Sequence, residues 1–508
     1  MDYVIGCDVG SQGTKAVLVS LDGNIVGEAY AGYEIDYPHP LWAQQPVTRW
    51  TNALRDVIRA LLHTTGVSGN TIRGLALATQ VDGVVPMDAN GSALYPAIIW
   101  MDRRAVAQCD TRRSPENENK FFKLTGLNLD ATHVAPKIAW LQENAPRLAE
   151  RAAYFLLPGS FMAFHLTGER AVDFSNASST LLFDVRAKQW SPEMCAAFQI
   201  DADKLAPVGA ASAVLGTLRA NIADELELSR ETRVMIGSGD EHAACVGAGV
   251  LTPGIVGDIA GTAEPVCAAS DALAFDETRL VESHCHAEEK QWLLENPGFV
   301  SGGNLRWYRD QFGAAEMRAA EERGVTAYQL FDESARNISA GAEGLVFLPC
   351  LMGAMTPTWN DAARGTFMGF TLAHTRAHFT RALLEGTAYA VRDVTDRFTA
   401  MGVPTRELRV MGGGARSALW NQIKADVTGL PVCVPQVTET TALGAAFLAL
   451  VGIGVYKTLQ EASAHIVRLV RYFEPHADTH KQYNALYALY RETYFALLPA
   501  FARAAKIS

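Results

Sequence analysis

The first residues that could do chemistry follow the opening apolar segment, where a carboxylate is succeeded by glycines, hydroxyls and a lysine. The string is Asp8-Val9-Gly10-Ser11-Gln12-Gly13-Thr14-Lys15. Glycines let the backbone approach an anion, hydroxyls donate to its oxygens, lysine supplies positive charge, and a carboxylate can hold Mg²⁺. These are the parts of a phosphate site, but an ordinary hairpin with a surface lysine would also contain them, and the spacing is not that of a P-loop.

A second segment, in the latter half of the chain, repeats this device. The string is Gly257-Asp258-Ile259-Ala260-Gly261-Thr262-Ala263. Recurrence of a strand, a Gly/Thr turn and a strand predicts two duplicated domains, each with a turn that has free backbone N–H groups. Two such turns facing each other across a cleft would hold the two ends of a triphosphate.

A third segment runs from a strand through three glycines into a helix start. The string is Arg409-Val410-Met411-Gly412-Gly413-Gly414-Ala415-Arg416-Ser417. A flat base or a phosphate could lie against such bare backbone at a helix N-terminus, although a tight connection would look the same. The spacing of a dinucleotide site is missing.

Two adjacent carboxylates, Asp240 and Glu241, end another apolar strand. The carboxyl end of a strand is where α/β sheets bind their ligands. Asp240 could accept the proton of an attacking hydroxyl. Its alternative role is that of a helix N-cap.

The elements that would position these residues are those of an α/β protein. Strands are predicted at residues 3–8, 14–20 and 25–26, which form a three-strand meander, and at residues 72–77. Apolar spacing predicts a helix over residues 50–62, and further strands at 84–87 and 97–100 are expected to extend the sheet. In the second half, strands are predicted at 255–260, 265–269 and 408–411, with a helix from Ser417 to Gly429.

The length of 508 residues suits two large domains. The turn-forming segment Leu251-Thr252-Pro253-Gly254 predicts the boundary between the two domains, which are expected at residues 1–250 and 251–508. Apolar residues make up 49% of the chain and charged residues 19%, as in a globular protein with a sizeable core.

The net charge of −11 argues against binding to nucleic acid or to an anionic membrane surface. Eight dispersed cysteines without a CxxC pair indicate a reducing compartment, and no signal peptide is visible, so a cytoplasmic protein is expected. The apolar run over residues 443–455 is shorter than the about 20 residues that span a bilayer, and we interpret it as a buried helix. The sequence is compatible with a homodimer and does not decide the oligomeric state.

Several strings, in this order along nearly the whole chain, resemble the FGGY family of carbohydrate kinases. They are Asp8 to Lys15 as given above, Trp100-Met101-Asp102-Arg103-Arg104, Gly237-Ser238-Gly239-Asp240, Gly369-Phe370-Thr371-Leu372-Ala373-His374-Thr375-Arg376-Ala377-His378 and Met411-Gly412-Gly413-Gly414-Ala415.

This resemblance implies an actin-like ATPase (ribonuclease H-like) fold of two duplicated domains with a central cleft, and transfer of the γ-phosphoryl group of ATP to a sugar or polyol hydroxyl. Asp240 matches the catalytic base, and Asp8 and Asp240 are expected at the Mg²⁺ ion. The first domain would also bind the sugar, through Gln80, Val81, Asp82, Trp100, Asp240 and Glu241. ATP would be bound by Gly10, Ser11, Gly13, Thr14 and Lys15, by Gly261 and Thr262, and on the adenosine side by Gly413, Gly414 and Asn421.

The acceptor is less well determined than the donor. Xylulose kinase-like members tend to carry Met-His where this chain has Val81-Asp82, and an amide where it has Glu241. The added acid favours a neutral polyhydroxylated substrate over an anionic one. A ketopentose such as xylulose is preferred, a glycerol- or erythritol-type polyol is the close alternative, and a nucleotide-switched protein of the same fold is the alternative from another class.

Overall fold

The first of two large sheets is built from strands of the N-terminal half. They are β1 (Tyr3–Val9), β2 (Gly13–Ser20), β3 (Ile25–Gly32), β5 (Ile72–Thr79), β13 (Val214–Thr217), β14 (Arg233–Met235) and β15 (Ser238–Gly239). In this computed structural model, which describes residues 1–507, their order is β13-β14-β5-β1-β2-β3, with β15 beside β5. The predicted meander β1-β2-β3 is antiparallel, and β5 runs parallel to β1. The carboxyl ends of β1 and β5 therefore meet at one edge of the sheet.

The second sheet repeats this plan. Its strands are β16 (Gly254–Ile259), β17 (Ala263–Ser270), β18 (Glu282–Cys285), β19 (Trp292–Val300), β22 (Thr405–Met411), β23 (Val432–Pro435) and β24 (Leu469–Phe473), in the order β18-β19-β17-β16-β22-β23-β24. Two antiparallel pairs followed by two parallel pairs occur in β3-β2-β1-β5-β14 and again in β19-β17-β16-β22-β23. The predicted duplication is confirmed at the level of sheet topology.

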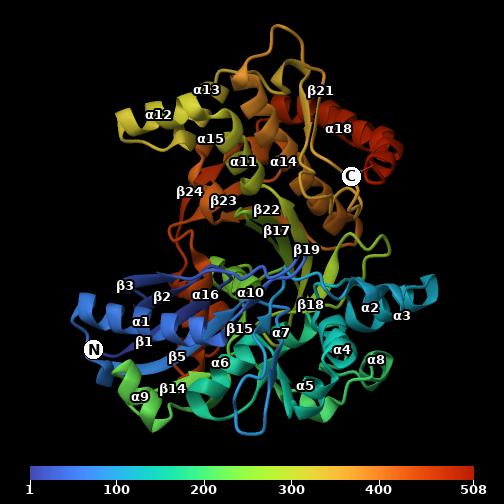
Figure 1. Cartoon of the computed structure of the whole chain (residues 1–508). Helices are drawn as coiled ribbons and strands as arrows, with labels where there is room; N and C mark the ends of the chain where they lie inside the picture. The colour runs from blue at the N-terminus through green and yellow to red at the C-terminus, as the bar shows by residue number, and fades with distance from the viewer. Residues whose placement is uncertain (508) are drawn as a thin grey trace.

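Helices cover both sheets, which lie one above the other in Figure 1. Those of the first half are α1 (Val47–Thr65), α2 (Val106–Asp110), α3 (Pro115–Thr125), α4 (Val134–Asn144), α5 (Pro146–Arg151), α6 (Pro158–Thr167), α7 (Phe174–Ser178), α8 (Pro192–Phe198), α9 (Ala220–Leu226) and α10 (Asp240–Ala248). Those of the second half are α11 (Gly302–Phe312), α12 (Ala314–Arg323), α13 (Ala327–Ala335), α14 (Arg376–Ala400), α15 (Ala418–Thr428), α16 (Thr440–Gly452), α17 (Leu459–Ile466) and α18 (Ala477–Ala504).

Helix α16 lies against the first sheet although it belongs to the second half of the chain (Figure 1). Glycines allow this close packing. A Cβ atom on Gly6 of β1 would lie 2.1 Å from the carbonyl oxygen of Ala442, and one on Gly444 would lie 1.9 Å from that of Ala243 in α10. The helix is apolar and buried along most of its length, as predicted for residues 443–455. The two halves are therefore joined through α10 and α16.

The strands predicted at residues 84–87 and 97–100 do not extend the first sheet, so that expectation is wrong. After β5 the chain turns at Asp82, whose φ of 57° is in the left-handed region, and leaves the sheet. The two strands that follow β5 form small sheets with other segments. Strand β6 (Val85–Met87) pairs with β8 (Tyr154–Leu156), and β7 (Ala97–Ile98) pairs with the earlier strand β4 (Gln44–Gln45). Other short pairs are β9 (Val172–Asp173) with β12 (Val208–Gly209), β10 (Phe183–Asp184) with β11 (Gln189–Trp190), and β20 (Val346–Leu348) with β21 (Thr366–Met368).

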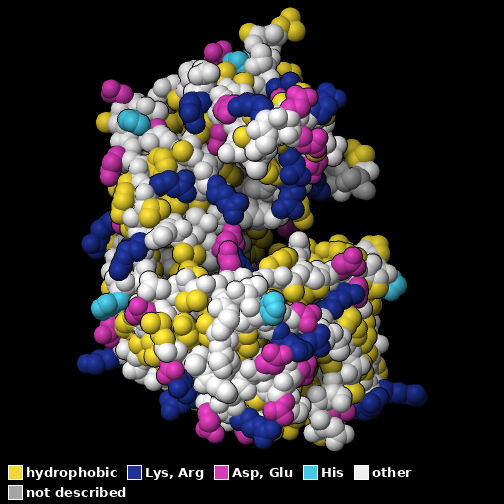
Figure 2. All heavy atoms as spheres, turned by 90° about the vertical axis from the view of Figure 1, so that its left-hand side faces the viewer, with side chains coloured by type: hydrophobic (Ala, Val, Ile, Leu, Met, Phe, Trp, Pro, Cys, Tyr) yellow, Lys and Arg dark blue, Asp and Glu magenta, His cyan; other side chains and the backbone are white. Residues whose placement is uncertain are grey.

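The space-filling view shows the surface hollowed between the upper and lower halves (Figure 2). All eight cysteines are buried and have free thiols. Within residues 1–507, none of the helices combines the length and the apolar character needed to cross a membrane.

Candidate active site

A backbone hydrogen bond from Gly10, the first residue of the turn, closes the turn between β1 and β2. The N–H group of Gly10 donates to the carbonyl oxygen of Gly13 at 3.0 Å, and the Tyr33 hydroxyl donates to the carbonyl of Gly10 at 2.6 Å. The N–H groups of Ser11 and Gln12 donate to no other group within residues 1–507. The expectation of free N–H groups thus holds for Ser11 and Gln12 but is wrong for Gly10.

Thr14 and Lys15 follow in β2. Thr14 is fully buried, and its hydroxyl lies near that of Tyr33. Lys15 lies directly opposite Asp8 in the β1–β2 register, and its ammonium group pairs with Glu28 at 3.3 Å. Cross-strand partners share a face of the sheet, so Lys15 is held on the same face as Asp8.

The turn between β16 and β17 is closed in the same way. The N–H group of Gly261 donates to the carbonyl oxygen of Ala263 at 3.0 Å, whereas that of Thr262 donates to no other group in the described chain. The guanidinium of the exposed Arg306, from α11, donates to the Thr262 hydroxyl at 3.3 Å. This turn therefore offers one free N–H group, one hydroxyl and a cation that the sequence did not single out as a phosphate ligand.

The glycine segment after β22 combines one tight contact with one open position. The N–H group of Gly414 donates to the carbonyl oxygen of Ala260 at 2.9 Å, and a Cβ atom on Gly414 would lie 2.6 Å from the Cβ of Ala260. A Cβ atom on Gly413 would meet nothing within 4 Å. Gly414 therefore fits the segment against the second turn, and Gly413 leaves bare backbone facing open space.

Asn421 lies in α15 and is fully buried. Its side-chain amide donates to the carbonyl oxygen of Ala415 at 2.9 Å. Asn421 therefore holds the glycine segment in place, and a contact with adenosine stays a prediction.

Two carboxylates from different elements, Asp8 at the end of β1 and Asp240 at the start of α10, lie within electrostatic reach. Burial raises the pKa of Asp8 to about 8, and repulsion from Asp240 and Glu439 adds to the effect. Burial likewise raises the pKa of Asp240 to about 8, with repulsion from Glu241. The oxygen Oδ1 of Asp8 is buried and unpaired within residues 1–507. Carboxylates that repel each other beside an unpaired oxygen fit a divalent cation such as Mg²⁺.

Asp240 does not cap α10. The cap position is Gly239, and Asp240 is the first helical residue, with its Oδ1 atom accepting the N–H of Glu241 at 3.0 Å. The N-cap alternative is therefore wrong, and the outer oxygen Oδ2 is not used by that bond.

Two of the predicted acceptor residues contact the turn between β1 and β2, and a third lies near Asp240. Trp100 is 39% exposed, and its indole N–H donates to the Ser11 hydroxyl at 2.7 Å. The buried Gln80 follows β5 and donates through its amide to the carbonyl of Gly10 at 3.4 Å. Asp82 is close enough to raise the pKa of Asp240 further. The turn between β1 and β2 is thus hydrogen-bonded to Trp100 and Gln80, two of the residues predicted to bind the acceptor.

Val81 lies beside the start of α10, since a Cβ atom on Gly239 would be 2.8 Å from a Val81 methyl group. Its neighbour Asp82 is buried, with its carboxylate 3.3 Å from Nδ1 of His133. Although burial lowers the pKa of His133, the charge of Asp82 raises it to about 9. The buried Lys137 donates to the Asp82 carbonyl at 2.6 Å, and burial lowers its pKa to about 8.

Glu241 faces the second half of the chain. Burial and repulsion from Glu295 of β19 raise the pKa of Glu241 well above its usual value. Burial raises the pKa of Glu295 to about 7. Two buried carboxyls that repel each other favour the protonated form, so Glu241 and Glu295 are proton-sensitive groups between α10 and the second sheet.

A buried ion triad stands behind the second turn. The ammonium of Lys424 in α15 pairs with Asp258 of β16 at 2.6 Å and with Glu264 of β17. The side chains of all three are at most 1% exposed. The triad therefore ties the helix that carries Asn421 to both strands of the second hairpin.

Sequence reasoning missed several of these residues. For Glu295 and Lys137 the sequence does contain an indication, since each is a single charged residue within an apolar stretch. Such a residue is seldom buried without a partner. For Glu439 the sequence contains no such indication, because this residue comes near Asp8 only through the packing of α16 on the first sheet.

Comparison with known proteins agrees with this geometry. The family model "FGGY family of carbohydrate kinases, N-terminal domain" matches residues 3–247, and the corresponding C-terminal model matches residues 259–453. A xylulose kinase of Bacillus subtilis is 28% identical over 97% of each chain, and a glycerol kinase of Aromatoleum aromaticum is 32% identical over 94% of this chain and 95% of its own. The solved xylulose kinase of Rhodospirillum rubrum is 28% identical, with a TM-score of 0.89 over 98% of this chain and all of its own. The chain belongs to the FGGY family of carbohydrate kinases, and is thus an ATP-binding sugar or polyol kinase with the two-domain, actin-like ATPase fold.

Proposed function

We propose that this kinase phosphorylates a hydroxyl of a neutral sugar, a ketopentose such as xylulose, with Asp240 as the base. The observation that carries the proposal is the place of Asp240 at the start of α10, within electrostatic reach of Asp8 on the phosphate side and of Asp82 on the acceptor side. Relatives named xylulose kinase, which match nearly the full length of the chain, support this acceptor class.

In this mechanism Asp240 accepts the proton of the acceptor hydroxyl as that oxygen attacks the γ-phosphoryl group. Phosphoryl transfer has a loose transition state, so positioning and charge stabilisation contribute more than the base. The N–H groups of Ser11, Gln12 and Thr262 would bind phosphate oxygens, and Lys15 and Arg306 would supply positive charge. Asp8 and Asp240 would hold Mg²⁺, which neutralises phosphate charge when bound.

The acidic acceptor wall supports a neutral substrate. Asp82, Asp240 and Glu241 can form hydrogen bonds with hydroxyl groups, whereas none of the three gives a carboxylate or phosphate a positive charge to pair with. Trp100 would pack its partly exposed ring against the carbon chain of the substrate.

A linear polyol of the glycerol or erythritol type is the second candidate. It is favoured by the bond between Trp100 and Ser11, which fixes an aromatic wall directly beside the phosphate turn, and by the glycerol kinase relative at 32% identity. For either acceptor we propose that residues 1–250 bind it and residues 251–508 bind the adenosine side of ATP.

An assay of ADP release across ketopentoses, aldoses, pentitols, glycerol, erythritol and gluconate tests the proposal. We expect the highest kcat/KM with a ketopentose and no stimulation by the anionic gluconate. A preference for glycerol or erythritol would select the second candidate. Preference for gluconate would contradict the neutral-acceptor assignment.

A further inference from the structure

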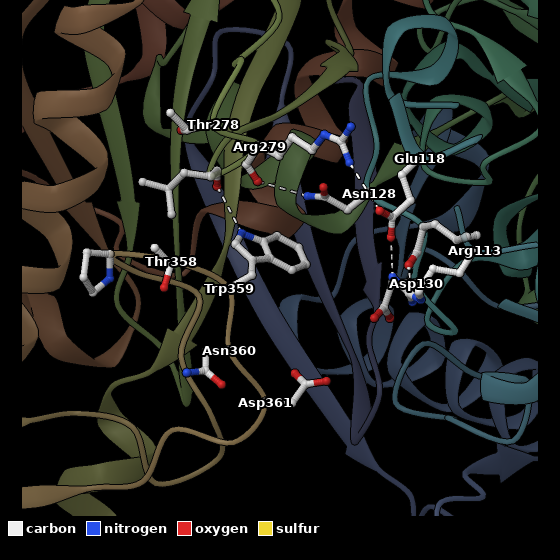
Figure 3. A pocket seen from close by; sticks show the side chains of 13 residues that line it. Arg113, Glu118, Asn128, Asp130, Thr278, Arg279, Thr358, Trp359, Asn360 and Asp361 are labelled. Carbon is white, nitrogen blue, oxygen red and sulfur yellow. Dashed lines mark hydrogen bonds and ion pairs between the residues drawn. The ribbon is translucent and has the colours of Figure 1, made fainter. Parts of the chain in front are cut away.

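A cavity of about 410 Å³ lies at the junction of the two halves, apart from the residues assigned above to catalysis and to the acceptor. One wall comes from the first half, with Glu118 of α3 and the segment 128–130. The other comes from the second half, with residues 278–280 and 357–361. Figure 3 shows Trp359 projecting from the second half towards Asn128 and Asp130 of the first. The volume is in the range of sites that bind small molecules.

The walls combine one aromatic ring with many hydrogen-bonding groups. Trp359 is half-buried, and its indole N–H donates to the carbonyl oxygen of Leu280 at 3.4 Å, which leaves the ring as a platform between the two walls. The side chains of Asn128 and Asp361 lie on either side of it. A sugar or polyol presents C–H groups that pack on an aromatic ring and hydroxyls that bond to amides and carboxylates.

The charges in the cavity argue against an anionic ligand. Two guanidinium groups are present, but Arg113 pairs with Glu118 at 2.5 Å and Arg279 approaches the same carboxylate at 3.8 Å. Asp130 is paired with Arg103 outside the cavity, and the exposed Asp361 has no ion pair within residues 1–507. Asp361 is therefore available as a hydrogen-bond acceptor, while both guanidinium groups are engaged with a carboxylate and give a phosphate or carboxylate no free cation.

The wall from the second half is held in a fixed conformation. The backbone of Arg279 has a φ of 58°, unusual for a residue with a side chain, and its N–H group donates to the carbonyl of Asp276 at 2.9 Å. The fully buried Asp276 carboxylate accepts the N–H groups of Leu280 and Val281 at 2.9 and 3.0 Å. The carbonyl of Arg279 then accepts the side-chain amide of Asn128 at 3.1 Å, which fastens the two walls together.

The first-half wall is continuous with the acceptor pocket. The N–H group of Asn128 donates to the buried Glu282 at 2.8 Å, and Asp130 accepts the N–H group of Thr132 at 2.8 Å. The next residue, His133, pairs with Asp82. A ligand in the cavity would therefore contact the chain segment that leads into the acceptor wall.

We propose that this cavity is a second binding site, for a neutral sugar or polyol, that bridges the two halves of the kinase. A ligand that contacts both walls favours the arrangement in which they are close together, so its binding is coupled to acceptor binding, and the coupling is reciprocal. Binding itself does not depend on the identity of the acceptor proposed above, and only the coupling rests on that proposed function.

The test uses the full-length protein labelled with fluorotryptophan, observed by ¹⁹F NMR without ATP. The Trp359 resonance is assigned by its absence from the Trp359→Phe variant. Titration with xylitol, erythritol and xylulose is expected to move this resonance saturably with at least one of them. Asp361→Ala should weaken that titration about tenfold, because a lost hydrogen bond to a charged group is worth that much. Glu277→Ala, an exposed carboxylate in the wall loop outside the cavity lining, is the matched control and should leave it unchanged.

Trp100→Ala separates this site from the acceptor pocket. The Trp359 titration should persist in that variant, and its loss would mean that the shift is transmitted from the acceptor pocket, which would overturn the proposal. A Trp359 resonance that none of the three molecules moves, or equal effects of Asp361→Ala and Glu277→Ala, would also overturn it. Since ATP is absent, failure of the kinase assay would reject the proposed function without touching this result.

Discussion

Asp240 and Glu241 are adjacent carboxyls at the start of α10 with different surroundings. Burial raises the pKa of Asp240 to about 8, and Asp240 interacts with the charges of Asp8 and Asp82, whereas Glu241 is buried and repelled by Glu295 of the second half. The two residues are therefore expected to respond differently to substitution by an amide.

Asp240→Asn should lower kcat by roughly 10²–10⁴ and leave ATP binding nearly unchanged, because the amide cannot accept the hydroxyl proton. Steady-state ADP release and ATP titration measure the two effects. Glu241→Gln is the matched comparison and should raise the KM for the acceptor more than it lowers kcat. Near-normal turnover in Asp240→Asn would remove this residue from the role of base.

Neighbouring glycines allow a test of the adenosine side. Gly413→Ala should raise the KM for ATP with little change in unfolding free energy, because the new methyl group enters open space. Gly414→Ala should cost about 1–3 kcal/mol of stability, because its Cβ meets Ala260. Denaturant unfolding and ATP kinetics of both variants check this, and equal losses of stability would contradict it.

Among the elements, the hairpin β16–β17 and the helix α15 depend on one buried ion triad. Lys424→Met would leave the buried carboxyls of Asp258 and Glu264 without their cation, and removal of one partner from a buried pair costs about 3–5 kcal/mol. We expect that loss in chemical denaturation, together with weaker ATP binding.

A surface ion pair provides the control for this change. Lys120 pairs with Glu193, and both side chains are about half exposed. Lys120→Met should therefore change the unfolding free energy by less than about 1 kcal/mol. Equal effects of the two lysine substitutions would contradict the role given to the triad.

Local pattern was sufficient for the elements that carry the motifs. The strands of both hairpins, the helix α1 and the apolar α16 follow from alternation, turn residues and helical spacing, and their glycine turns were found with them. The short strands β6 and β7 were assigned to the wrong sheet, because the turn at Asp82 depends on a backbone angle that no local pattern encodes. The contacts of Lys424, Glu295 and Glu439 were missed because they depend on pairing between distant segments.

On the scale of the whole molecule, several carboxyls with raised pKa values lie where the two halves meet. The pKa is about 8 for Asp8 and Asp240, and about 7 for Glu282 and Glu295. A carboxyl whose folded pKa exceeds its unfolded value keeps its proton in the folded chain while the unfolded chain has lost it. Such a group stabilises the folded state less as pH rises towards the folded pKa.

The stability of the ligand-free protein should therefore fall between about pH 6.5 and 8. Below pH 6.5, His284 and His286 make the stability rise with pH and so oppose the effect of the carboxyls, because burial lowers the pKa values of these two histidines from 6.5 to about 3 and 4. Within it, His133 acts in the same direction as the carboxyls, because its folded pKa of about 9 is also raised. Thermal unfolding against pH, with Glu295→Gln as a variant of smaller slope, measures this. A stability that rises from pH 6.5 to 8 would contradict it.

The eight buried thiols have a practical consequence for measuring how the two halves move. Burial raises the pKa of Cys7, Cys109, Cys285, Cys350 and Cys433, and a thiol that stays protonated inside the protein reacts slowly with maleimides. A cysteine introduced at an exposed position in each half, such as Asn119 and Thr358, would then be labelled selectively without removing any native one. Spin labels at such a pair would report the distance across the molecule directly, before and after nucleotide is added.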